Sequence, residues 1–184
     1  MALTPSTMLP LGTIAPNFAL PDTEGKIITL DSFPAAKGYL VMFICNHCPY
    51  VIHLKSHLAS LTAEYVKKGI AVFGINSNDS AKYPEDSPAK MKQDKKQFNY
   101  AFPYLVDETQ KVAKAYQAAC TPDFFLFDAD KKLVYRGQYD SSRPKNGILI
   151  TGSDLRKALE AVLNKSSIDP DQIPSIGCNI KWRD

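Results

Sequence analysis

Two cysteines separated by two residues have the spacing for redox chemistry. Cys45 and Cys48 frame the tetrapeptide Cys-Asn-His-Cys, which follows the apolar run at residues 39–44. Two thiols at this spacing can close a small disulfide and reopen it by exchange with another thiol. Pro49 and the helical spacing of the apolar residues after it indicate that a helix starts here. The pattern predicts a redox-active pair where a buried strand turns into a helix.

The start of a helix is a favourable place for such a pair. The helix is expected to span residues 48–68 and to end at the Lys67-Lys68-Gly69 stop signal. Its first turn has N–H groups without helical partners, and the helix dipole is positive at that end. Both lower the pKa of a thiol placed there, because they favour the thiolate.

Other interpretations of the pair involve metals or no chemistry at all. A structural four-cysteine zinc site needs a second closely spaced pair, but the remaining cysteines, Cys120 and Cys178, lie far apart in the sequence. A carrier of copper(I) or zinc built from Cys45, Cys48 and a histidine stays open. Two further interpretations also stay open: a redox sensor without turnover, and two inert buried cysteines. We favour redox catalysis, which requires no cofactor and no resident metal ion.

The composition is that of a soluble globular protein, and we predict one domain spanning residues 1–184. Hydrophobic residues make up 45% of the chain, charged residues 22%, and the net charge is +3. So small a charge does not indicate nucleic acid or a membrane as partner. Residues 1–12 lack the pattern of a secretory signal, and no apolar run is long enough to cross a bilayer. We therefore expect a cytoplasmic protein, in which a cysteine pair is more often catalytic than structural.

The elements that position the pair alternate along the chain. A β-hairpin is expected within residues 11–33. Further strands are predicted at residues 39–44, 70–75, 104–106, 123–127 and 133–135, and helices at 48–68, 87–99, 109–118 and 153–163. This order predicts an α/β sheet with helices on both faces. The tail at 165–184 is expected to be irregular, and its apolar residues indicate that it packs onto the body.

The chain resembles the thioredoxin-fold redoxins of the alkyl hydroperoxide reductase/thiol-specific antioxidant superfamily, and within it a peroxiredoxin-like thioredoxin subfamily. The resemblance rests on the opening Ala15-Pro-Asn-Phe-Ala-Leu-Pro-Asp-Thr-Glu-Gly25, the Cys-x-x-Cys, the Thr121-Pro122 step and the ending Ser175-Ile-Gly-Cys-Asn-Ile-Lys-Trp182. It implies a thioredoxin-like α/β fold with an N-terminal β-hairpin extension and an irregular C-terminal tail.

The resemblance also implies roles for individual residues. Thr121 and Pro122 match the cis-proline loop, in which the proline lies against the Cys-x-x-Cys and the backbone before it pairs with the substrate chain. Cys45 is expected to be the exposed attacking thiolate, and Cys48 the more buried resolving thiol. The activity implied is thiol–disulfide exchange with protein or low-molecular-weight thiols and disulfides.

His47 is the third candidate catalytic residue. In the strongly oxidising members of the superfamily, a histidine also precedes the second cysteine. Its partial positive charge favours the thiolate and hence the reduced form, so we predict a pair more oxidising than that of thioredoxin. His53 and His57 are expected on the solvent-facing side of the helix.

The main rival activity is a thiol-dependent peroxidase, with Cys48 or Cys45 as the peroxidatic residue. Peroxiredoxins have a threonine or serine three residues before the cysteine that precedes proline, and here that position holds Cys45. Arg136 and Arg143 are the candidates for the peroxiredoxin arginine, and both are expected at the surface. Thioredoxin's buried aspartate is replaced by Tyr39.

Cys120 and Cys178 are possible auxiliary thiols. Cys120 adjoins the Thr121-Pro122 loop and is expected near the active pair without belonging to it. Cys178 lies in the tail. The two cysteines could form a second disulfide, relay electrons to the pair, or act as small buried hydrophobic residues.

Overall fold

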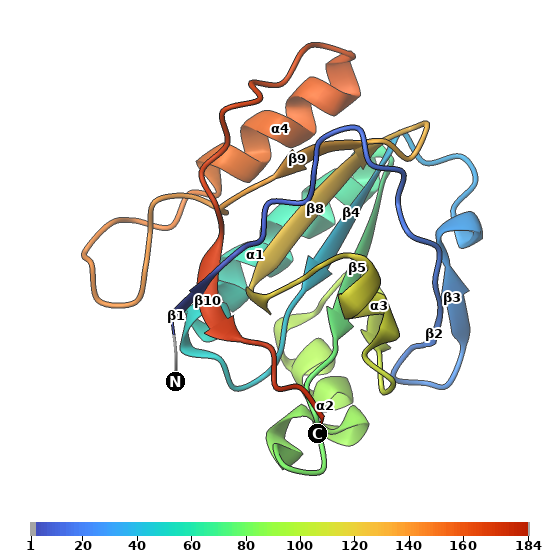
Figure 1. The fold of residues 1–184 in the computed structure, drawn as a ribbon, viewed down its shortest axis with the longest axis vertical. Coiled ribbons are helices and arrows are strands. Elements are labelled where there is room, and N and C mark those ends of the chain that lie inside the picture. The colour runs from blue at the N-terminus through green and yellow to red at the C-terminus, as the bar shows by residue number, and fades with distance from the viewer. Residues whose placement is uncertain (1–2, 184) are drawn as a thin grey trace.

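A mixed sheet forms the centre of the computed structural model, which describes residues 3–183 (Figure 1). Within these residues the central sheet has five strands in the order β6-β5-β4-β8-β9. The strands are β4 (Gly38–Phe43), β5 (Ile70–Asn76), β6 (Tyr104–Val106), β8 (Asp123–Asp128) and β9 (Leu133–Arg136). β4, β5 and β6 are parallel, and β8 is antiparallel to both β4 and β9. The ends of the predicted domain, residues 1, 2 and 184, lie outside the described part.

Strand β4 shows why the sheet is covered on both faces. Leu40 and Met42 pack into one hydrophobic cluster, whereas Val41 and Phe43 pack into another on the opposite face. Successive side chains of a strand point to opposite faces, so an uninterrupted apolar run has to be buried on both sides. The predicted α/β architecture with helices on both faces is confirmed.

The first cluster contains residues of α1 (Pro49–Lys68), α2 (Pro88–Phe98) and α4 (Ser153–Asn164). The second contains residues of the short helix α3 (Lys111–Ala115) and of the hairpin formed by β2 (Ala19–Pro21) and β3 (Ile27–Thr29). The predicted hairpin is therefore present. In Figure 1, α1 lies behind the sheet and α3 lies in front of it.

Helix α1 begins and ends close to the predicted residues. Cys48 is its N-cap residue and Pro49 its first helical residue. The helix ends at Gly69, whose φ of 101° lies in the left-handed region that glycine adopts without strain. Strand β4 therefore leads through residues 44–47 directly into a long helix that packs against the sheet.

The tail differs from the prediction in one segment. Residues of the tail form a strand, β10 (Ile176–Asn179), between β1 (Leu3–Pro5) and β7 (Cys120–Thr121). Both neighbours are antiparallel to β10, and Figure 1 shows β10 beside β1. The short strand escapes the sequence analysis because its pairing partners come from distant parts of the chain.

No helix among the described residues has the length and apolar character needed to span a membrane.

Candidate active site

The two cysteines of the predicted pair lie at the junction of β4 and α1, and both are inaccessible to solvent. Cys45 and Cys48 each have 0% relative exposure. The expectation that Cys45 is exposed is therefore wrong. All four cysteines of the chain are buried and none forms a disulfide, so the structure shows the dithiol form of the site.

The Thr121-Pro122 loop lies against the pair, as predicted. The Thr121–Pro122 peptide bond is cis. The Cys48 thiol donates a hydrogen bond to the Thr121 carbonyl oxygen at 3.1 Å. The Cys45 sulfur lies 3.4 Å from the Thr121 hydroxyl oxygen. One residue of this loop thus contacts both sulfurs through different atoms.

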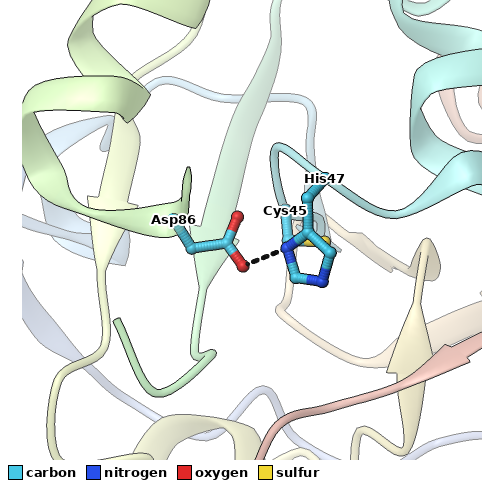
Figure 2. Close-up of side chains that lie close together, drawn as sticks. All are labelled: Cys45, His47 and Asp86. Carbon is cyan, nitrogen blue, oxygen red and sulfur yellow. Dashed lines mark ion pairs between the residues drawn. The ribbon is translucent and has the colours of Figure 1, made fainter. Parts of the chain in front are cut away.

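His47 forms an ion pair with a carboxylate that the sequence analysis does not single out. Its Nδ1 lies 2.8 Å from Oδ2 of Asp86, in the short turn η2 (Pro84–Asp86). Figure 2 shows these two side chains together with Cys45. The His47 ring also stacks on Tyr83, with ring centroids 5.4 Å apart. The hydrogen bond from His47 to Asp86 raises the pKa of His47, although burial opposes this shift.

Asp86 is ionised because several donors surround it. Its side chain is fully buried, and burial raises its pKa. Donors outweigh that effect: His47, the Asn78 amide at 2.7 Å and the Asn46 backbone N–H at 2.8 Å all favour the carboxylate. The net result is a lowered pKa for Asp86.

Asn46 fixes the loop between the cysteines. Its side-chain amide donates to the Glu85 carbonyl at 2.8 Å, and its side-chain oxygen accepts from the Tyr104 hydroxyl at 2.9 Å. The Lys55 ammonium donates to its backbone carbonyl at 3.0 Å. Together with the bond to Asp86, these contacts occupy its backbone and side-chain polar groups. The loop is therefore held rigidly against η2.

The two thiols of the pair have opposite pKa shifts. The hydrogen bond between them raises the pKa of Cys45, and burial and the nearby Asp86 carboxylate raise it further. The same hydrogen bond lowers the pKa of Cys48 to about 5, against the effect of burial; Cys178 and the Val51 backbone N–H also favour its thiolate. Of the two thiols, Cys48 at the start of α1 therefore ionises more readily than Cys45, and its ionisation gives up the hydrogen bond to the Thr121 carbonyl.

The two auxiliary cysteines occupy different environments. Cys178 lies opposite Thr121 in the β10–β7 pair and packs in the same buried cluster as Cys48. Burial and the neighbouring Cys48 side chain raise the pKa of Cys178 to about 12. The Cys120 sulfur faces the Pro122 carbonyl at 3.6 Å, and burial raises its pKa strongly. Cys178 thus contacts the active pair directly.

The remaining histidines are not simply solvent-facing. Both are half-buried on α1. The Nε2 atom of His53 lies 3.2 Å from the Ser142 hydroxyl, and Nδ1 of His57 lies 2.6 Å from the Tyr139 hydroxyl. The prediction of surface positions for both is wrong, because segments after β9 pack against this side of the helix.

The two candidate arginines are also half-buried. Arg136 donates to the Leu9 carbonyl and the Gln172 side chain. Arg143 donates to backbone carbonyls of its own loop and to the Gln138 side chain. These hydrogen bonds engage both guanidinium groups with residues other than the two cysteines.

Three ligand-type atoms also lie close enough together to hold a metal ion. Cys45, His47 and Asp86 each offer one such atom, and these atoms lie within 4.8 Å of one another. The Asp86 oxygens, however, already accept hydrogen bonds from Asn46 and Asn78. An ion would have to displace these bonds, so the arrangement favours an electrostatic role for Asp86 over metal binding.

The sequence does contain one signal for Asp86. Parallel strands β4 and β5 end at the same edge of the sheet, so the segment that follows each strand lies at that edge. The polar segment after β5 is therefore expected near the Cys-x-x-Cys, and it leads into η2. Only the folded chain shows which of its polar side chains meets His47.

Comparisons with known proteins place the chain in a family. The chain matches the AhpC/TSA family over residues 11–136. It is 26% identical over 155 residues to the thiol-disulfide oxidoreductase ResA of Bacillus thuringiensis subsp. konkukian, covering 84% of this chain and 78% of ResA. A crystal structure of an uncharacterized conserved protein from Geobacillus kaustophilus is 51% identical, with a TM-score of 0.97 and coverage of 100% and 97%.

A more distant structure supports the fold alone. The thioredoxin domain of a thiol-disulfide oxidoreductase from Bacteroides vulgatus is 19% identical, with a TM-score of 0.65, covering 85% of this chain and 99% of that domain. The fold and the paired thiols define a thioredoxin-fold redox protein. The chain belongs to the AhpC/TSA family, and the ResA relative that it resembles is a thiol-disulfide oxidoreductase.

Proposed function

We propose that this protein exchanges disulfides through Cys45 and Cys48, with Cys48 as the attacking thiolate. The observation that carries the proposal is the placement of both sulfurs against Thr121, with Cys48 at the N-cap of α1 and Cys45 beside the Asp86 carboxylate. A negative charge is stabilised at a helix start and destabilised next to a carboxylate. The roles expected from the resemblance are therefore reversed.

The reaction balances as two exchange steps. The Cys48 thiolate attacks one sulfur of a partner disulfide and forms a mixed disulfide, and the other partner sulfur leaves as a thiolate. Cys45 then loses its proton to that thiolate and attacks the Cys48 sulfur. The Cys45–Cys48 disulfide forms, and the partner is released as a dithiol. The partner gains two electrons, the pair loses two, and the reverse sequence oxidises a partner dithiol.

Single-cysteine variants test the roles. Reduced Cys45→Ser, mixed with a peptide disulfide and quenched early with acid, is expected to form a mixed disulfide at Cys48, seen by mass spectrometry. Cys48→Ser should lose catalysis and trap little partner. The matched control, Cys120→Ser, should turn over like the wild type. If Cys48→Ser instead traps the partner at Cys45, then Cys45 is the attacking thiolate, as the resemblance implies. If the wild type exchanges no disulfide, the proposed function is wrong.

Partner and location follow from the proposed chemistry. We propose protein or low-molecular-weight disulfides as substrates and the cytoplasm as the compartment, in which a cysteine pair is more often catalytic than structural. Trapping with Cys45→Ser in fractionated cells tests both. Partners found only in secreted material would overturn the location.

A thiol-dependent peroxidase is the second candidate function. The observation in its favour is the lowered pKa of Cys48, which precedes Pro49 at the start of a helix. Against it, a thiol occupies position 45, and Arg136 and Arg143 donate hydrogen bonds to other residues rather than to either sulfur. We expect peroxide turnover to be slow compared with disulfide exchange. Fast, saturable peroxide turnover that survives Cys45→Ser and is lost in Cys48→Ser would favour the peroxidase.

A further inference from the structure

Strand β10 occupies the position in which the thioredoxin-like resemblance places a substrate. That resemblance implies that the backbone before Pro122 pairs with a substrate chain. In this protein the same backbone pairs with the chain's own tail: Cys178 lies opposite Thr121, and Asn179 lies opposite Cys120, in antiparallel register. The tail is thus arranged like a bound substrate strand that carries a cysteine.

The cysteine of that strand faces the active pair. Cys178 belongs to the same buried cluster as Cys45 and Cys48, and its side chain lowers the pKa of Cys48 by favouring the Cys48 thiolate. Thr121, its partner across the strands, contacts both sulfurs of the pair. Cys48 therefore has a thiol on two sides, Cys45 from its own loop and Cys178 from the tail.

The register of β10 is fixed on both sides of Cys178. Before it, the Ser175 hydroxyl donates to the Pro122 carbonyl at 2.6 Å. After it, the Ile180 N–H donates to the Ala119 carbonyl at 3.1 Å, and the Lys181 N–H donates to the Asn78 side chain at 2.8 Å. Antiparallel pairing alternates side chains between faces, so a fixed register also fixes the direction of Cys178.

Gly177 shows how closely the two backbones approach. A Cβ built at this residue would overlap the Thr121 carbonyl group. Glycine inside a strand is typical of places where another backbone comes very near. The residue next to Cys178 thus allows the tail to lie directly on the loop that contacts both catalytic sulfurs.

We propose that Cys178 is a third redox thiol, which resolves a mixed disulfide on Cys48 by forming a Cys48–Cys178 disulfide. The inference rests on the proposed function, because that function supplies the mixed disulfide. Cys178 attacks the Cys48 sulfur, the bond between Cys48 and the partner breaks, and the partner leaves as a thiolate that takes the proton lost by Cys178. The two cysteines lose two electrons, and the partner disulfide is reduced to two thiols.

The resolving step is favoured once Cys48 carries a partner. In the dithiol form the charge of Cys48 raises the pKa of Cys178. Formation of the mixed disulfide removes that charge, so Cys178 ionises more readily at the moment when it has to attack. The product is a covalent tie between α1 and β10 that leaves Cys45 as a thiol.

The experiment uses the full chain and oxidised glutathione. Reduced Cys45→Ser is treated with oxidised glutathione, and the products are followed by mass spectrometry and peptide mapping. We expect the glutathione adduct on Cys48 to decay into a Cys48–Cys178 disulfide. In Cys45→Ser/Cys178→Ser the adduct should persist at least about tenfold longer. Cys45→Ser/Cys120→Ser is the matched control and should behave like Cys45→Ser.

The outcomes separate this inference from the proposed function. An adduct on Cys48 that decays equally slowly with and without Cys178 overturns the inference alone. If neither the wild type nor Cys45→Ser reacts with glutathione at Cys48, the proposed function fails and the inference fails with it. If the double variant does not fold, disulfide mapping of oxidised Cys45→Ser decides, since it must contain a Cys48–Cys178 linked peptide.

Discussion

His47 and Asp86 form a buried ion pair directly beside the redox-active cysteines, with 2.8 Å between Nδ1 and Oδ2. The pair places a positive and a negative group at the same loop, so the histidine does not act as an isolated charge. The carboxylate raises the pKa of Cys45. The asymmetry between Cys45 and Cys48 therefore depends on a residue that lies outside the Cys-x-x-Cys motif.

Replacing Asp86 by asparagine should reduce this asymmetry. The amide keeps the shape of the side chain but removes its charge, so the pKa values of both His47 and Cys45 should fall. The His47 pKa can be followed by the NMR titration of its ring protons, and that of Cys45 by the thiolate absorbance of a Cys48→Ser background. An unchanged His47 pKa would contradict the ion pair.

The His47–Asp86 pair should make stability depend on pH. The pKa of His47 is raised above its ordinary 6.5, so its contribution is complete below that value and lost as the pH rises through the raised pKa. The pKa of Asp86 is lowered below its ordinary 3.8, so its contribution is complete above 3.8 and lost on further acidification. The pair therefore stabilises the fold most between these two ordinary values.

In that window, His47→Ala should lower the free energy of unfolding by about 1 to 3 kcal/mol, and by less at about pH 9. Urea denaturation at both pH values measures the difference. In the Asp86→Asn background the same substitution should lose this pH dependence. A loss that is equal at both pH values would show that His47 acts by packing alone.

The thiolate of the reduced protein should be that of Cys48. Its absorbance should titrate with a pKa of about 5, and Cys45→Ala should raise that pKa, because the substitution removes a hydrogen-bond donor. Ultraviolet absorbance against pH measures both. The absorbance transition must vanish in Cys48→Ser. If it persists in that variant, another cysteine forms the thiolate.

The reduction potential of the pair should lie above that of thioredoxin, about −270 mV. The Cys48 charge raises the pKa of His47, so by reciprocity the protonated imidazole favours the Cys48 thiolate and hence the reduced form. His47→Ala should lower the potential, as measured by equilibration with glutathione. If the wild type and the variant have equal potentials, His47 does not tune the pair.

Replacing Gly177 by alanine should loosen β10. The new Cβ overlaps the Thr121 carbonyl, so the strand has to move, at a loss of about 1 to 3 kcal/mol in unfolding free energy. Cys48 should then react faster with iodoacetamide, because the strand that carries Cys178 lies against it. Ile176→Ala is the matched control, since it alters the same strand without an overlap. Equal alkylation rates in the wild type, Gly177→Ala and Ile176→Ala would show that β10 does not control access to Cys48.

The sequence by itself determines the chemistry and most of the architecture. The apolar run before Cys45 and the helical spacing after Pro49 define the strand–helix junction. The order of strands and helices defines the α/β sheet. These features are local in the chain: each depends on spacing or periodicity within a few residues, which is why the sequence reveals them.

The tertiary structure decided which residues surround the thiols. Asp86 reaches His47 because two parallel strands end at one edge of the sheet. Cys178 reaches Cys48 because β10 pairs with a loop more than fifty residues earlier in the chain. The burial of Cys45 follows from the same packing. Contacts between distant segments depend on the closed fold, so the sequence supplies the reactive groups and the fold determines which of them ionises.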